Sequence, residues 1–206
     1  MLGHGIQNYS CSANTTEAPE AKGALAVLYD ITALYPGTPR SGLPSIQAFN
    51  ALTTRVLWTS NLPLNFLNVS AAASGIILPS KDYAATATPF QLPKDLTLDN
   101  LAPIKYAGHH YFDSTTTANF DLISPGNLKA HVVKKASVAV PASADKGLLK
   151  TGAVQWLQLG DSGLGISHGL NQVYRVVTAG GIGESCAVAG KSFGSVPYTA
   201  QYWFYS

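Results

Sequence analysis

Charged side chains are scarce in this sequence. Of its 206 residues, 13 are Lys or Arg and 11 are Asp or Glu, so the charged fraction is 12%, about half of the ~25% that is usual in globular proteins. The formal net charge is +2, and the largest basic cluster is the pair Lys134-Lys135. A nucleic-acid-binding surface needs many cations to neutralise phosphates, so we expect no nucleic-acid partner.

A membrane-spanning segment is also missing. The longest uncharged stretch, residues 56–80, is interrupted by Asn, Pro and Gly residues, which would place costly polar groups in hydrocarbon. We therefore expect no membrane span. Residues 1–5 lack the basic and apolar regions of a signal peptide. Two interpretations follow: the protein is cytosolic, or a leader has been removed from the chain.

Cysteine is almost absent, with only Cys11 and Cys186 near opposite ends of the chain. The count leaves two interpretations open. One bridge would close nearly the whole chain and stabilise it by about 5 kcal/mol in the loop-entropy model, whereas two unrelated buried thiols would add nothing of this kind. Three N-glycosylation sequons begin at Asn8, Asn14 and Asn68, and together with the low charge they favour an extracellular protein.

Apolar residues, at 46%, are sufficient for a buried core, and 19 Gly and 12 Pro divide the chain into short segments. Residues 24–30 form an apolar run typical of a buried strand. Strands are also predicted at residues 106–112, 118–123, 130–140, 154–159, 173–178 and 198–205. One helix is predicted over residues 41–52, with Ser41 as its cap and Pro44 in its first turn.

Short strands separated by turns predict an all-β fold, an antiparallel β-sandwich or barrel with at most one or two short helices. We expect a single domain over residues 1–206. Residues 61–101 show little periodicity, so we expect a long irregular insertion or loops there, with one strand near residues 76–78. A loop region of this length is often functional.

Several glycine-containing motifs are interpreted as turns. Residues 160–163, Gly-Asp-Ser-Gly, match the stretch around the nucleophile of chymotrypsin-like proteases, but the histidine context of those enzymes is missing and Leu164-Gly165 follows. Gly3-x-Gly5, Gly163-x-Gly165 and residues 180–183 approach a dinucleotide fingerprint, yet none lies between a strand and a helix. We interpret these as turns or bulges and expect no cofactor.

The histidines are the main candidates for chemistry. His109 and His110 are adjacent on a predicted strand, so their side chains face opposite sides of the sheet. Asp113 follows at the strand end, and His4 and His131 lie elsewhere in the sequence. Such a set could form a His/His/Asp metal site, but no ligand spacing supports it. We expect no metal, with His109, His110 and Asp113 as the only weak candidates.

Aromatic residues suggest ligand binding. Trp58, Trp156 and Tyr111 are candidate ligand-binding residues, because an exposed ring with an apolar face can stack on a sugar. Trp203 and the nearby tyrosines on the last predicted strand have the same chemistry, although aromatic residues on strands more often belong to the core. Arg175 lies in an apolar strand, where it either faces solvent or pairs with a carboxylate such as Asp30 or Glu184.

Several segments together resemble a known family. They are GHGIQNYSC at residues 3–11, PEA and ALAVLYD within residues 19–30, HYFD at 110–113, VYRVVTAGG at 173–181 and VPYTAQYWFY at 196–205, with Trp156-Leu157 and Cys186 between them. The family is the secreted, mostly fungal domain of unknown function 3455. The resemblance spans nearly the whole chain except residues 61–101.

The resemblance implies an extracellular, mostly β protein whose leader has been removed, with a Cys11–Cys186 disulfide. It supplies neither an activity nor a catalytic residue. Members of the family often carry a malate dehydrogenase label. We expect no NAD-dependent dehydrogenase, because the sequence lacks a dinucleotide fingerprint in its proper context and the alternation of strands and helices that accompanies it.

Two classes of function follow from the sequence. The leading hypothesis is an extracellular binding protein for a carbohydrate or cell-wall ligand, with exposed aromatic residues and polar loops on a rigid β scaffold. The alternative is a secreted hydrolytic or metal-assisted enzyme with a site around His110 and Asp113, joined by His4 or His109. A structural wall component without a small ligand is a third interpretation.

Overall fold

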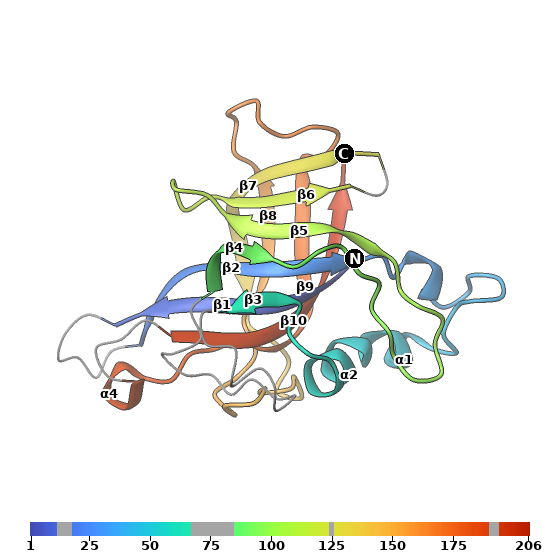
Figure 1. The fold of residues 1–206 in the computed structure, drawn as a ribbon, viewed down its shortest axis with the longest axis horizontal. Helices are drawn as coiled ribbons and strands as arrows, with labels where there is room; N and C mark the ends of the chain where they lie inside the picture. The colour runs from blue at the N-terminus through green and yellow to red at the C-terminus, as the bar shows by residue number, and fades with distance from the viewer. Residues whose placement is uncertain (12–17, 67–84, 124–125, 190–193) are drawn as a thin grey trace.

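The protein folds around a closed barrel of eight antiparallel strands (Figure 1). The computed structural model describes residues 1–11, 18–66, 85–123, 126–189 and 194–206. The barrel strands are β1 (Leu2–Ser10), β2 (Glu20–Tyr29), β5 (Tyr106–Phe112), β6 (Ala118–Leu122), β7 (Leu128–Val138), β8 (Trp156–Asp161), β9 (Gln172–Gly180) and β10 (Gly194–Tyr205). Their order around the barrel is β1-β10-β9-β8-β7-β6-β5-β2. The predicted all-β class is confirmed, with a barrel rather than a sandwich.

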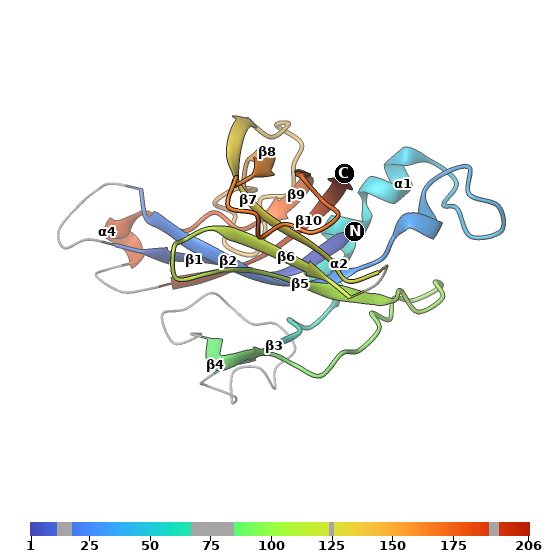
Figure 2. The same cartoon turned by 90° about the horizontal axis from the view of Figure 1, so that it is seen from above.

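The remaining elements lie outside the barrel. They are the 3-10 helix η1 (Thr32–Leu34), the helices α1 (Ile46–Asn50), α2 (Leu52–Thr59) and α4 (Cys186–Ala189), and a two-stranded sheet of β3 (Leu64–Phe66) and β4 (Ala85–Phe90). This small sheet covers the outer face of β1 and β2, where Leu64 and Phe66 pack against Ile6 (Figure 2). The region expected to be irregular therefore contains two strands. The strand predicted at residues 76–78 lies outside the described residues.

The predicted helix begins later than expected. Ser45, not Ser41, is the N-cap of α1, and its Oγ accepts a hydrogen bond from the Ala48 N–H at 3.1 Å. Ser41 instead donates to the Ala33 carbonyl, and Pro44 precedes the helix. The β-region conformation of Ser45 ends the loop and satisfies a free N–H of the first turn, which is the role of a capping serine.

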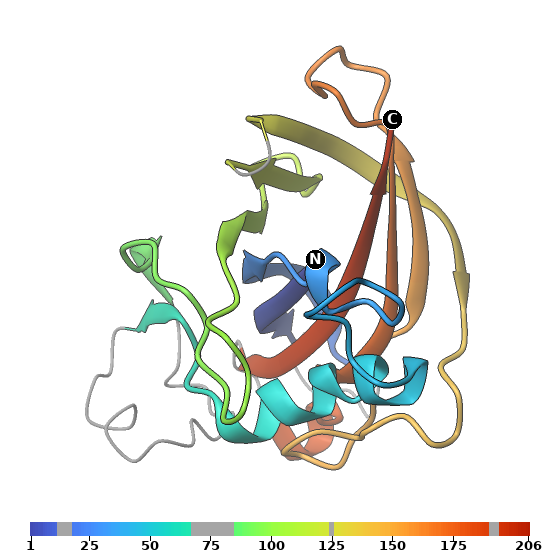
Figure 3. The same ribbon diagram turned by 90° about the vertical axis from the view of Figure 1, so that its right-hand side faces the viewer.

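The helices are attached to the outer face of the barrel through β10 (Figure 3). Thr199 Oγ1 donates to the Thr53 carbonyl at 2.7 Å, and Gln201 Nε2 donates to the Phe49 carbonyl at 3.3 Å. Apolar side chains of both helices, including Phe49 and Val56, complete an outer core against β1 and β2. These contacts bury both faces of β10 over residues 195–202, since its alternate side chains fill the barrel interior.

The interior of the barrel is packed with side chains. Phe120 stacks on His110 with ring centroids 4.0 Å apart and meets Tyr202 edge-on at 5.1 Å. Arg175 also points inward, and its guanidinium donates to the Gln155 carbonyl at 3.0 and 3.2 Å. The suggested carboxylate partners are therefore wrong: among the described residues, Arg175 makes no ion pair. Its charge is buried against a neutral oxygen.

Strand β1 was not predicted, because its two glycines suggested a turn. Instead, Gly3 and Gly5 lie within β1, which pairs with β2 on one side and β10 on the other. A Cβ at Gly5 would overlap the Leu25 carbonyl oxygen, and one at Gly3 would meet the Tyr202 ring. The glycines are needed for close approach of neighbouring strands, which is one of the recognised reasons for glycine inside a strand.

Replacing Gly5 by Ala should lower the free energy of unfolding by about 1–3 kcal/mol, the usual cost of adding a methyl group to a packed site. The added methyl meets backbone atoms, which cannot move away as a side-chain end can. Urea unfolding of the Gly5→Ala variant measures this cost. Gly194→Ala is the matched control, since no atom of the described residues lies within 4 Å of its added Cβ. Equal stability of both variants would contradict the packing argument.

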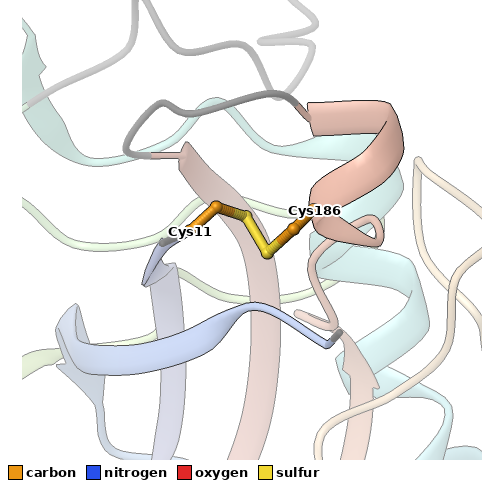
Figure 4. Close-up of a disulfide and its surroundings, with 2 residues drawn as sticks. All are labelled: Cys11 and Cys186. Carbon is orange, nitrogen blue, oxygen red and sulfur yellow. A yellow bond between two sulfur atoms is a disulfide. The ribbon is translucent and has the colours of Figure 1, made fainter. Parts of the chain in front are cut away.

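A disulfide joins Cys11 to Cys186, as the family resemblance implied (Figure 4). The two Cα atoms lie 5.4 Å apart, and the bond connects the end of β1 to α4 across a sequence separation of 175 residues. This separation is bridged because β1 and β10 are neighbours in the barrel. Among the residues that the structure describes, none of the helices is long and apolar enough to cross a bilayer.

Candidate functional site

The structure separates the predicted catalytic candidates. His110 lies inside the barrel, where its Nδ1 contacts the Asn119 carbonyl at 2.8 Å and burial lowers its pKa to about 4. Asp113 lies in the turn between β5 and β6, and His4 lies on the outer face of β1. These three side chains do not meet, so the site proposed around His110 and Asp113 is not assembled.

His4 and His109 both lie on the outer face of the barrel but have different surroundings. His4 is 1% exposed, its Nδ1 has no hydrogen-bond partner among the described residues, and burial lowers its pKa to about 3. His109 stacks on Phe90 at 3.8 Å and lies 3.0 Å from the Tyr106 hydroxyl. Within the described part of the chain, no three His, Cys, Asp or Glu side chains cluster as metal ligands would.

The predicted aromatic candidates lie on three different elements. Trp58 of α2 is 46% exposed, and its Nε1 donates to Asp145 at 2.7 Å. Trp156 begins β8, and its buried Nε1 has no partner in the part of the chain that the structure describes. The Tyr111 hydroxyl of β5 donates to Asp121 at 2.8 Å. The hydroxyl of Tyr111 and the indole N–H of Trp58 are therefore already used within the protein.

Of the three sequon asparagines, only Asn8 lies within the described residues. Asn8 lies on β1, and its Oδ1 accepts a hydrogen bond from Ser195 Oγ at 2.8 Å. Asn14 and Asn68 lie outside the described residues. Sugar attachment at the three asparagines stays a prediction.

A different set of aromatic side chains gathers on the outer face of β9 and β10. We call it the Trp203 surface and define it as Tyr35, Tyr174, Trp203 and Tyr205. Tyr174 and Trp203 are paired across the two strands. Tyr35 reaches Trp203 from the segment after η1, with ring centroids 5.8 Å apart, and Tyr174 meets Tyr205 edge-on at 5.8 Å.

Strand alternation explains why these rings are exposed. Tyr202 and Phe204 of β10 point into the barrel, so Trp203 and Tyr205 must point outward. Trp203 is 38% exposed and Tyr205 48% exposed. The edge-to-face ring pairs are the arrangement that aromatic quadrupoles favour, and they hold the rings in place.

Two hollows share Trp203 in their linings. The first has a volume of about 430 Å³ and is lined by Met1, Ile31, Tyr35, Phe49 and Trp203, among others. The second, also of about 430 Å³, is more open and is lined by Gln172, Tyr174, Val176, Trp203 and Tyr205. Neither lining contains a charged side chain. Trp203 is therefore available to a ligand bound in either hollow.

Asp113 belongs to a separate hydrogen-bonded group with His131 and Ser162. Its Oδ1 accepts hydrogen bonds from Thr115 and Thr117 within the turn. Its Oδ2 lies 3.0 Å from His131 Nε2, and the other ring nitrogen of His131, Nδ1, lies 2.7 Å from Ser162 Oγ. Hydrogen bonds from Thr115 and Thr117, and a further one from His131, hold the pKa of Asp113 well below its usual value.

Ser162 belongs to the Gly-Asp-Ser-Gly motif that we interpreted as a turn. A turn does form, because Gly163 has a φ of +80° and its N–H donates to Asp161 Oδ2 at 2.7 Å. The same turn also directs the hydroxyl of Ser162 to His131. The Gly-Asp-Ser-Gly motif was thus the only sequence signal for this contact. The sequence around His131 gave no signal of its own.

Comparison with protein-family models identifies the family of this chain. The family model described as protein of unknown function (DUF3455) matches residues 1–206. The chain belongs to the DUF3455 family. Neither a curated protein nor a solved structure matches it. This DUF3455 chain is an antiparallel barrel, not the doubly wound parallel sheet that binds NAD in dehydrogenases.

Proposed function

We propose that this chain is an extracellular binding protein for a neutral carbohydrate, and that the Trp203 surface is its binding site. The observation that carries the proposal is the group of exposed rings that lines two adjacent hollows without charged side chains. Exposed rings gathered on one face of a protein mark a binding site more often than isolated ones do.

The chemistry of the lining favours a neutral sugar over other ligands. A phosphate or an acidic peptide would need cationic side chains, and a basic partner would need carboxylates, but neither lining contains a charged side chain. A purely apolar ligand would leave the tyrosine hydroxyls and the Gln172 amide without partners. A sugar ring presents C–H groups on its faces and hydroxyls at its edges, which suits aromatic faces with polar tips.

The disulfide supports the proposed compartment. Disulfides persist in oxidising environments and are rare in the cytosol, and the Cys11–Cys186 bond uses both cysteines of the chain. An extracellular protein with a rigid barrel and exposed aromatic residues is suited to bind a cell-wall polysaccharide, which is itself extracellular and mostly uncharged.

Retention on insoluble chitin, β-glucan, cellulose and xylan, followed by calorimetry with oligosaccharides of the retained polymer, tests the proposal. We expect Trp203→Ala to weaken binding at least tenfold, equivalent to about 1.4 kcal/mol, because the substitution removes the wall shared by both hollows. Trp58→Ala is the matched control: it removes an exposed tryptophan from α2 and should leave the affinity unchanged.

Two results would contradict this assignment. One is that none of the four polysaccharides retains the wild-type protein. The other is that Trp203→Ala, folded as judged by its unfolding temperature, binds as well as wild type. Loss of binding in Trp58→Ala alone would move the site to α2.

A further inference from the structure

Ser162, His131 and Asp113 come from three parts of the chain that meet on the outer face of the barrel. Asp113 belongs to the β5–β6 turn, His131 to β7, and Ser162 to the segment after β8. The ring of His131 lies between the other two side chains, at 3.0 Å from the carboxylate and 2.7 Å from the hydroxyl. We propose that these residues form a catalytic site that hydrolyses small acyl esters, with Ser162 as nucleophile and His131 as general base.

The carboxylate decides which nitrogen of His131 acts as the base. Asp113 already accepts hydrogen bonds from Thr115, Thr117 and Asn119, as an ionised carboxylate does. It can therefore only accept from His131, which places the ring proton on Nε2. Nδ1 then carries a lone pair and accepts the Ser162 proton. This is the order of a serine–histidine–aspartate relay, with the two ring nitrogens exchanged relative to the serine proteases.

Backbone contacts hold the base and the nucleophile in register. The Ser162 N–H donates to the His131 carbonyl at 3.0 Å, and the His131 N–H donates to Ser167 Oγ at 3.0 Å. Because the segment after β8 is thus attached to β7 at Ser162 and again at Ser167, the hydroxyl does not depend on a free loop for its position. His131 itself is 2% exposed, so its ring has little freedom to turn away.

Access is from the solvent side of the same segment. Ser162 is partly exposed, and residues 163–166 are exposed. The Leu164 N–H donates to Ser162 Oγ at 3.4 Å, so a backbone donor lies directly beside the atom that attacks. A donor in this place can stabilise the negative charge that develops on a carbonyl oxygen. The open surroundings suit a small acyl group carried on a larger alcohol.

The reaction balances without a metal or a redox partner. Ser162 Oγ bonds to the ester carbonyl carbon while its proton moves to His131 Nδ1, and the alcohol leaves with that proton. Water then attacks the acyl-serine, again giving a proton to Nδ1, and the carboxylic acid leaves as Oγ regains its hydrogen. Ester and water are consumed, acid and alcohol are formed, and Asp113 stays ionised as the positioning residue.

A fluorophosphonate probe and p-nitrophenyl acetate test the site in the intact, disulfide-bonded protein. We expect one probe molecule to attach to Ser162 in the folded chain, located by peptide mass spectrometry, and none in urea. Ester hydrolysis should fall about a hundredfold or more in Ser162→Ala. Ser137→Ala is the matched control, because Ser137 is an exposed serine of β7 and should not alter the rate.

The Asp113→Asn variant shows whether the hydrogen bonds of Asp113, His131 and Ser162 serve catalysis or only stabilise the structure. An amide donates where the carboxylate accepted, so the ring proton moves and kcat should fall by about 10³-fold or more, with KM unchanged. Unaltered probe attachment and hydrolysis in Ser162→Ala would overturn the proposal, as would a folded wild-type protein that neither reacts with the probe nor cleaves the ester. The wild-type measurements hold even where a variant fails to fold.

Discussion

Lowering the pH from 7 to 5 should reduce the free energy of unfolding by about 4 kcal/mol, because two fully buried histidines are neutral in the folded chain. Burial lowers the pKa of His4 to about 3 and that of His110 to about 4, whereas an unfolded histidine has a pKa of about 6.5. Between these values the unfolded chain binds more protons than the folded one. Each histidine therefore costs about 2 kcal/mol over this interval.

The sign of the effect follows from the neutral form being the stable one inside the protein. Above the unfolded pKa of about 6.5 neither state is protonated, so the folded state keeps its full stability. Stability is then lost progressively as the pH falls toward the folded pKa values of about 3 and 4. Among the described residues, His4 Nδ1 has no hydrogen-bond partner and neither His4 nor His110 forms an ion pair, so this part of the chain offers no counter-ion to a protonated ring.

Urea unfolding at pH 7 and pH 5 measures this dependence. His4→Leu should remove about half of the difference, since a leucine fits the apolar surroundings and cannot be protonated. His168→Gln is the control, because His168 is exposed and should leave the difference unchanged. A wild-type protein that is equally stable at pH 7 and pH 5 would contradict the conclusion that these two histidines are buried in their neutral form.

The β strands were predictable because their residues carry local signals. Strands β5 to β10 are rich in β-branched and aromatic residues, and alternation placed His109 and His110 on opposite sides of the sheet. The structure confirms this, with His109 on Phe90 outside the barrel and His110 on Phe120 inside it. Strand β1 gave no such signal, because Gly5 is required by a neighbouring strand and not by its own segment.

The candidate sites depend on contacts that sequence patterns do not contain. One residue of the Trp203 surface, Tyr35, belongs to a loop that is far from β10 in the sequence. His131 meets Ser162 across 31 positions and Asp113 across 18, with no motif that joins the three. Periodicity can assign a side chain to a face, but the closure of the barrel decides which faces and turns become neighbours.

Replacing Cys11 and Cys186 together by Ser should lower the free energy of unfolding by about 5 kcal/mol. The bond closes a loop of 175 residues, and the loss of freedom that it imposes on the unfolded chain gives this value in the loop-entropy model. Because a typical domain is stable by only about 5–15 kcal/mol, we expect a chain without the bond to be marginally folded at best.

Reduction of the wild-type protein distinguishes the covalent link from the packing of the sulfur atoms. If the link is the cause, reduced wild type and the double variant should unfold at similar urea concentrations, both well below that of the oxidised protein, and reductant should not affect the double variant. An oxidised protein no more stable than the reduced one would show that β1 and α4 are held together by the barrel alone. The same result would remove the main physical support for an oxidising compartment, since a bond without effect on stability gives the fold no reason to require one.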